Sequence, residues 1–300
     1  MNTKRVSFGL AVLISGSLLF GAINLEKADA LYEQDAFAQT QTELQKQLKT
    51  ASTAEEEAQV LWRLARVMVG LGDDLKDDDK AGKFAMYEQG EAYALQSIEK
   101  YPMAMGYQWK ASNIGRWGQT KGPLNALGKA KGMLEDLTQI VNSFNTLDST
   151  DTWYVLSSLY DELPGGFISF GNKDWAVSYM RMAMDTLRSD QFKPGHYKKL
   201  AEELYARNWN ASKRSKELKK MEQDWNQASS NLEKYRYYEG KDGGKSKPFY
   251  SPVTLDKMSD RQEAVMVLTY ALQKEKVFKP IKPSDAEDLS DIKQLLDDWT

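Results

Sequence analysis

The sequence predicts an all-α protein made of antiparallel helix pairs that stack into an array. Its 300 residues are 41% hydrophobic and 11% aromatic, which is enough apolar material for a substantial core. Small residues with helical spacing lie between regularly placed aromatic residues, and such regularity is typical of repeat proteins. The aromatic residues follow one another at 47, 44 and 44 positions and are Trp62, Trp109, Trp153 and Tyr197.

Composition excludes several classes of function. With 40 basic and 43 acidic side chains, the chain lacks the excess of cations that general nucleic-acid binding requires. The absence of cysteine excludes disulfides, thiolate nucleophiles and most structural zinc sites. His196 is the single histidine, so Ser-His-Asp chemistry and sites with several histidine ligands are also excluded. We therefore expect no nucleic-acid partner, no metal, no cofactor and no enzymatic activity, and an exposed or helix-capping role for His196.

Residues 1–30 read as a secretory signal peptide. Lys4 and Arg5 precede an apolar run over residues 6–23, and Ala28-Asp29-Ala30 is a small-x-small tripeptide of the kind that signal peptidase cuts. This pattern predicts a periplasmic protein with no membrane span after cleavage. An uncleaved signal anchor is the alternative, because the apolar run is nearly long enough to cross a bilayer.

Each repeat unit is predicted to contain a helix A with the aromatic residue and a helix B with small residues. Positions three, four and seven apart share one face of a helix, and helix B shows the spacing four then three. Thr53-x-x-Glu56 resembles a capping box before the first helix A, and Pro123 suits a first helical position. The helix B signatures are Gly90-Ala94-Ser97, Ala130-Leu134-Leu137 and Ala176-Met180-Ala183.

These units resemble the tetratricopeptide repeat, whose helix A pattern runs Trp, Leu, Gly, Tyr. The third unit is the best match, with Trp153, Leu156, Ser157 and Tyr160. The resemblance covers about residues 54–210 and implies a right-handed solenoid, since one helix pair cannot bury its apolar face alone. We therefore expect a repeat domain over residues 31–210.

The stretches between helices A and B are longer than in a standard tetratricopeptide repeat. They run over 21 positions from Val69 to Gly90, 14 from Arg116 to Ala130 and 16 from Tyr160 to Ala176. Equivalent insertions in a solenoid emerge on one edge, and long loops on a rigid scaffold often bind partners.

Two segments favour a divergent subgroup of this repeat class. The run Trp-Arg-Leu-Ala-Arg at 62–66 and the turn Leu-Pro-Gly-Gly-Phe-Ile-Ser-Phe-Gly-Asn at 163–172 are similar to the T-component proteins of TRAP-type transporters and, more distantly, to the regulator of microtubule dynamics family. The first resemblance implies an exported protein that binds a transporter partner or a small ligand through its helical array.

The C-terminal third, residues 211–300, is predicted to pack on the repeats. Residues 211–239 read as one long polar helix that caps the solenoid, and residues 240–252 as a linker rich in Gly, Ser, Lys and Pro. Capping boxes at Ser259-x-x-Gln262 and Ser284-x-x-Glu287 predict two further helices.

The acidic stretch 73–79 invites comparison with a calcium-binding loop. Counted from Asp77, the chain places Asp, Asp, Gly and Glu at positions 1, 3, 6 and 12 of such a loop. Ala81 and Ala85 stand where two further oxygen ligands belong, so a solvated loop is favoured.

We expect an exported, non-enzymatic scaffold that binds a protein or peptide partner in the cell envelope. The alternative is a periplasmic accessory protein of a solute transporter, with a small anionic ligand in a pore lined by Arg and Trp. The four repeat aromatics are expected in the core. The candidate binding residues are Arg63, Arg66, Arg116, Trp117, Phe167, Phe170 and Trp175.

Overall fold

The computed structural model describes residues 23–278 and 281–300, and every regular element in these ranges is helical. The predicted all-α class is confirmed. Within these ranges, no helix is both long and apolar enough to cross a bilayer, and the apolar run over residues 6–23 lies outside them except for Ile23. The helices are α1 (Glu26–Tyr32), α2 (Phe37–Thr50), α3 (Ala54–Asp73), α4 (Lys80–Lys100), α5 (Ala104–Lys121), α6 (Pro123–Thr138), η1 (Gln139–Ser143), α7 (Thr150–Glu162), α8 (Lys173–Asp185), α9 (Pro194–Arg207), α10 (Ala211–Gln227), α11 (Asn231–Tyr235), η2 (Tyr238–Gly240), η3 (Leu255–Lys257), α12 (Asp260–Glu275) and α13 (Pro283–Trp299).

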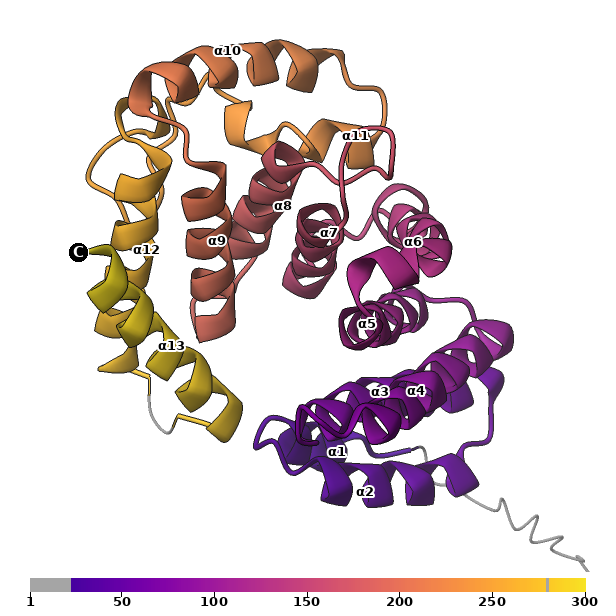
Figure 1. The fold of residues 1–300 in the computed structure, drawn as a ribbon. Coiled ribbons are helices and arrows are strands. Elements are labelled where there is room, and N and C mark those ends of the chain that lie inside the picture. The colour runs from indigo at the N-terminus through magenta and orange to yellow at the C-terminus, as the bar shows by residue number, and fades with distance from the viewer. Residues whose placement is uncertain (1–22, 279–280) are drawn as a thin grey trace, which may run out of the picture.

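The predicted helix pairs are α3 with α4, α5 with α6, and α7 with α8, and they follow one another along a curved array (Figure 1). The four repeat aromatics lie on α3, α5, α7 and α9 and are between 0% and 8% exposed. Their predicted place in the core is therefore correct. Trp153 and Tyr197 belong to the main apolar cluster, whereas Trp62 and Trp109 share a smaller cluster with Ala65 and Ala94.

Small residues on the B helices allow close packing against the A helices. A Cβ on Gly90 would lie 2.0 Å from Oδ1 of Asn113, so any side chain here would force α4 and α5 apart. The Asn113 amide donates to the carbonyl of Ala65 at 3.0 Å, and the Ser97 hydroxyl donates to the carbonyl of Ala58 at 2.9 Å. These buried bonds join neighbouring helices through backbone groups that larger side chains would cover.

Local sequence signals fix most helix starts. The Thr53 hydroxyl accepts from the amide of Glu56 at the start of α3, and Ser259 forms the predicted capping box with Gln262 at α12. Gly122 turns the chain between α5 and α6 with a φ of +93°, a value that favours glycine. The capping box predicted at Ser284 is wrong, because α13 begins one residue earlier at Pro283.

The C-terminal third differs from the prediction in three ways. The long helix expected over 211–239 is broken, since α10 ends at Gln227 and the short α11 follows. The segment 240–252 is no loose linker: Gly240, Gly243 and Gly244 are buried against α10. The boundary at residue 210 is misplaced, because α12 packs against α9 as the second helix of a fourth pair. Residues 211–259 are therefore an insertion within that pair.

The two ends of the array meet. The start of α13 lies beside the turn between α1 and α2 (Figure 1), where the amide and hydroxyl of Ser284 donate to Oδ2 of Asp35 at 3.1 and 2.8 Å. Lys282 adds a longer contact to the same carboxylate, at 3.9 Å. The curved array is thus closed by a polar contact between its first and last helices.

Candidate functional site

Arg63 and Arg66, two predicted binding residues, hold the first helix in place. Arg63 donates from Nε and Nη2 to the carboxylate of Asp29 on α1 at 3.0 Å, and Arg66 donates to the same group at 2.6 Å. Arg66 also lies 3.8 Å over the ring of Tyr32. Burial alone would raise the pKa of Asp29, but the two guanidinium groups outweigh it and lower the pKa. Both arginines therefore anchor α1, but Arg66 makes a single hydrogen bond there and its buried Nε has no partner among the described residues.

The same contacts correct the predicted signal-peptide boundary. Cleavage after Ala30 would remove Asp29, the carboxylate that anchors both arginines, and Ala28, which is 0% exposed in the N-terminal core. The tripeptide Ala28-Asp29-Ala30 lies inside α1 rather than in an extended, accessible segment. Of its two small residues, Ala28 is buried in the N-terminal core and Ala30 is exposed.

Arg116 and Trp117, at the end of α5, are also held by neighbouring helices. Arg116 has a side chain that is 43% exposed and pairs with Asp73 of α3 at 3.0 Å. The indole of Trp117 donates to Glu88 of α4 at 3.0 Å, and the ammonium of Lys129 lies 4.9 Å from its ring centroid. The structure thus places these two residues between repeats and keeps them partly accessible.

Trp175 and Phe170 pack against Tyr160 of α7. The ring centroids lie 5.4 Å and 5.6 Å from that of Tyr160. Arg236, from the C-terminal insertion, covers Trp175 at 4.4 Å. Phe170 therefore joins the 163–172 loop to the third helix pair, and Trp175 joins the insertion to it. Neither residue is a free binding surface.

Phe167 differs from the other candidates because it is fully exposed. The loop that carries it is closed at its base: the amide of Gly171 donates to the carbonyl of Pro164 at 3.1 Å, and Asn172 donates to Tyr160 at 2.9 Å. A Cβ on Gly171 would lie 1.9 Å from the carbonyl oxygen of Leu163, so only glycine fits there. This closed stem presents Phe167 at 112% exposure and its neighbour Ile168 at 65%.

An apolar groove of about 60 Å³ lies next to this loop, between α5, α6 and α7. Leu124, at the start of α6, is 65% exposed and follows the neighbouring A–B turn. Gln119 donates to Glu162 at 2.6 Å across the rim. The groove, Leu124, Phe167 and Ile168 together are called the loop edge below. The groove is lined by Ile114, Gly115, Gly118, Gln119, Ala126, Ala130, Met133, Ser158, Leu159, Glu162 and Leu163.

The acidic stretch 73–79 does not form a calcium-binding loop. Asp79 accepts from the amide of Gly82 at 2.9 Å as the cap of α4, and Asp77 pairs with Lys83 at 2.8 Å. From residue 80 the chain is helical, which removes the extended loop that such a site requires.

His196 is buried, so the expectation of an exposed or capping histidine is wrong. Its ring lies 4.7 Å from that of Tyr154, and it is 7% exposed. Burial and the nearby cation Lys193 lower its pKa to about 3, against the opposing effect of Asp151. The imidazole is therefore neutral at physiological pH and packs as a core side chain.

Sequence reasoning missed a cluster of six buried ionic side chains beneath the C-terminal insertion. Three arginines form ion pairs with three carboxylates, and each side chain is at most 6% exposed. The partners lie up to 82 residues apart in the chain, so no local motif could reveal them. This ionic cluster consists of Arg181, Arg207, Arg214, Glu239, Asp260 and Glu263.

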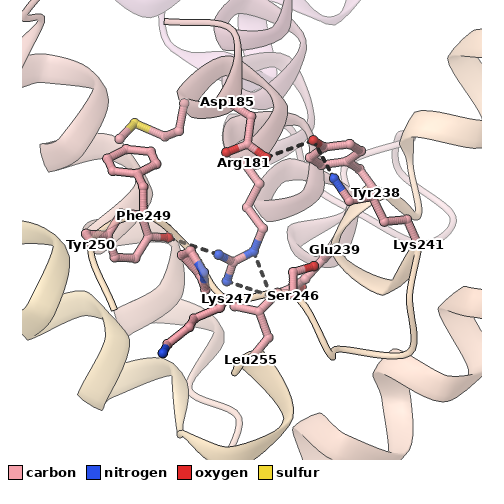
Figure 2. A pocket seen from close by; sticks show the side chains of 12 residues that line it. Arg181, Asp185, Tyr238, Glu239, Lys241, Ser246, Lys247, Phe249, Tyr250 and Leu255 are labelled. Carbon is pink, nitrogen blue, oxygen red and sulfur yellow. Dashed lines mark hydrogen bonds and ion pairs between the residues drawn. The ribbon is translucent and has the colours of Figure 1, made fainter. Parts of the chain in front are cut away.

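A cavity of about 300 Å³ opens beside the ionic cluster, between α8 and the segment that runs from η2 to η3. Figure 2 shows Arg181 between Phe249 and Tyr250 on one side and Tyr238 and Lys241 on the other. The lining combines aromatic and aliphatic groups with charged ones. Its residues are Arg181, Met184, Asp185, Tyr238, Glu239, Lys241, Ser246, Lys247, Pro248, Phe249, Tyr250 and Leu255.

Comparison with known proteins finds one family over the first part of the array. Residues 24–139 match the family model of regulator of microtubule dynamics protein 1-3, which covers α1 to the beginning of η1. Regulator of microtubule dynamics protein 1 from Bos taurus is 35% identical over 99 residues. The match covers 33% of this chain and 29% of that protein. The predicted likeness to this family is thereby supported for the N-terminal repeats, and these matches lend no support to the likeness to TRAP T-component proteins.

The predicted periplasmic location is wrong. The matched relative is an animal protein, and animal cells have no periplasm. The family match also begins at residue 24, inside the segment that was expected to be a removable signal peptide. The N-terminal part of this chain is thus similar to the regulator of microtubule dynamics proteins, beginning with α1.

Proposed function

We propose that this chain is a non-enzymatic scaffold that binds a protein partner at the loop edge. The observation that carries the proposal is the closed loop 163–172, which holds Phe167 and Ile168 in solvent beside an apolar groove. Single exposed apolar residues are common, but a protruding set beside a groove is typical of an interaction site.

The chemistry of the loop edge defines the kind of partner. The groove is mainly apolar, with the Gln119–Glu162 hydrogen bond at its rim. Leu124 on α6 and Phe167 and Ile168 in the loop 163–172 are exposed, and both segments also supply residues to the lining of the groove. A partner segment with apolar anchor side chains would fill the groove and cover these three residues, which matches the apolar centre and polar rim of protein interfaces.

The buried charges support a structural rather than a catalytic role. In the ionic cluster every carboxylate is paired with at least one guanidinium group. Glu203, whose pKa burial raises to about 6, contacts Ser157 at 2.5 Å and Lys199 at 3.2 Å inside the helix packing. These groups join helices, and of the ionic cluster only Arg181 and Glu239 line the adjacent cavity, where they are paired with each other.

The similarity to regulator of microtubule dynamics protein 1 supports a regulatory, protein-binding role. The matched range includes α5 and α6, two of the three helices around the groove, whereas the loop 163–172 lies beyond it. The chain spans only 29% of that relative's length. That the two proteins bind the same partner is therefore proposed here and does not follow from the match. The alternative of a ligand pore lined by Arg and Trp is not favoured, because neither cavity described above has Arg63, Arg66 or a tryptophan in its lining.

A displayed library of random peptides, selected on the purified chain, tests the proposal. Selected peptides should carry apolar anchors and bind in a fluorescence anisotropy assay. Burying a Phe side chain contributes roughly 1.5–3 kcal/mol, so F167S should weaken binding by about 10- to 100-fold.

The matched control is V277S, which changes another exposed apolar residue, 76% accessible, that follows α12 and is not part of the loop edge. Peptide affinity should be unchanged in this variant. The proposal fails if no peptide is enriched, or if F167S and V277S bind the selected peptides equally well.

A further inference from the structure

The cavity beside the ionic cluster carries an inference that goes beyond the proposed protein-binding function. It lies in the C-terminal insertion, away from the groove between α5, α6 and α7. Its volume of about 300 Å³ is at the lower end of the range for small-molecule sites. A ligand in this cavity would bind through the polar groups of the lining that have donors or charges not already paired within the protein.

Arg181, the most prominent cation of the cavity, has no donor left. Its Nε donates to Glu239 at 3.0 Å, and Nη2 donates to Glu239 at 2.8 Å and to Glu263 at 2.6 Å. Its Nη1 donates to Glu263 at 2.6 Å and to the hydroxyl of Tyr250 at 3.1 Å. All five N–H groups are therefore used within the protein.

The hydroxyl groups and carboxylates of the lining are also engaged. Tyr250 donates to Glu263 at 2.7 Å, and Tyr238 donates to Asp185 at 2.8 Å. Burial and the Asp185 carboxylate raise the pKa of Tyr238, which keeps this phenol protonated as a donor. The Tyr238 hydroxyl also accepts from Lys241, so it links the Asp185 carboxylate to that ammonium group.

Lys241 and Lys247 are the groups that retain free donors. Lys241 uses one N–H in a 2.7 Å bond to the Tyr238 hydroxyl, so two of its three remain. Lys247 is exposed at the mouth. Among residues 23–278 and 281–300, no carboxylate forms an ion pair with either lysine. The lining holds three cations, Arg181 and these two lysines, against the anions Asp185 and Glu239, a net charge of +1.

The opposite wall is apolar and aromatic. Met184, Pro248, Phe249 and Tyr250 face the cavity, and Figure 2 shows Phe249 and Tyr250 on the side away from Lys241. Phe249 is 49% exposed, so a ligand body packed on its ring would gain apolar burial. A bound molecule therefore needs one negative charge and an apolar body of matching size.

We infer that this cavity binds a small organic monocarboxylate with an aromatic or branched apolar body. Its carboxylate pairs with Lys241, Lys247 at the mouth adds a second positive charge, and its body packs on Met184 and Phe249. Such a ligand contacts both α8 and the segment 241–250 of the insertion. It therefore stabilises the folded insertion and raises the thermal midpoint of the chain.

The test uses the full chain and three carboxylates with their matched neutral amides: benzoate and benzamide, phenylacetate and phenylacetamide, and indole-3-acetate and indole-3-acetamide. Calorimetric titration and thermal denaturation should show saturable binding of at least one acid, at least tenfold tighter than its amide. The inference is overturned if no acid binds at millimolar concentration, or if acid and amide bind alike.

Variants locate the site. The double variant K241M/K247M should weaken binding of the acid by at least tenfold, whereas K257M, which removes an exposed lysine outside the cavity, should leave it unchanged. Equal affinity in the two variants would assign the binding to another place and overturn the inference. Because the acid–amide comparison uses the unaltered chain, it remains decisive even if the double variant folds poorly. Peptide binding at the loop edge is measured separately, so either proposal can fail alone.

Discussion

Glu263 offers the sharpest test of how the C-terminal insertion is held on the array. Its carboxylate accepts two bonds of 2.6 Å from Arg181 and one of 2.7 Å from Tyr250, and it also pairs with Arg214. The side chain is 0% exposed. The change E263Q removes one negative charge and leaves the ionic cluster with three cations and two anions.

The magnitude follows from the pKa of Glu263. Burial alone would raise this pKa, but Arg181 and Arg214 outweigh burial and lower it from 4.5 to about 2. At about 1.4 kcal/mol for each tenfold change in proton affinity, this corresponds to roughly 3 kcal/mol. Removing one partner of a buried ion pair costs about 3–5 kcal/mol by experience with other proteins. We expect E263Q to lower the free energy of unfolding at pH 7 by about 3–5 kcal/mol.

The pH dependence has a definite sign. Because the folded-state pKa lies below the unfolded-state value, the contribution of Glu263 is complete above about pH 4.5 and is lost as the pH falls towards 2. Urea denaturation followed by tryptophan fluorescence, repeated through this range, should show the difference between the two proteins shrinking towards acid.

Two further variants complete the experiment. E287Q changes an exposed carboxylate on α13 and should alter stability by less than about 0.5 kcal/mol. The charge-balanced double variant R214M/E263Q should recover part of the loss, because it also removes the uncompensated cation. A loss below about 1 kcal/mol in E263Q, or a loss that is the same at pH 7 and pH 3, would refute the reasoning.

Three other predictions follow from buried contacts. W153A removes a side chain that is 0% exposed and should lower the free energy of unfolding, measured by thermal denaturation, by about 3–5 kcal/mol. A loss as small as that of W117A, which changes a half-buried residue, would contradict the core role of Trp153. D29N weakens the anchor of Arg63 and Arg66, so amide exchange over Glu26–Tyr32 should accelerate, and unchanged protection would count against it. G171A places a methyl group 1.9 Å from the Leu163 carbonyl and should weaken peptide binding as strongly as F167S, whereas full affinity would show that the loop stem is unimportant.

The helix pairs could be predicted from the sequence because their determinants are local and periodic. Trp62, Trp109, Trp153 and Tyr197 recur at nearly equal spacing, and each is buried as expected. Helix caps depend on residues three positions apart, so the capping box at Ser259 was also predictable. Such features require no knowledge of distant contacts.

The remaining features depend on contacts between distant segments. Arg181 and Glu263 are 82 residues apart, and nothing near either residue distinguishes it from a surface charge. The fourth helix pair could not be predicted from repeat spacing, because residues 211–259 separate α9 from α12 in the sequence. A small residue such as Ala28 fits both a cleavage site and a buried helix face. The burial of Ala28 and the contact between Asp29 and two arginines of α3 separate these interpretations.

Among the predicted binding residues, the sequence could not separate free aromatic and basic groups from structural ones. Trp175 and Phe170 are aromatic residues near the third hairpin, as Phe167 is, yet both are packed on Tyr160. The difference arises from the loop stem, where Gly171 lies against Leu163, and this closure requires a three-dimensional structure to be seen.

Photo-cross-linking in cells that express the protein tests most directly whether the loop edge is a protein interface. A benzophenone amino acid would replace Phe167 in one variant and Val277 in another, since both positions are widely exposed. The proposal predicts a discrete adduct with one partner protein from position 167 and none from position 277. No adduct at position 167, or the same pattern of adducts from both positions, would contradict it.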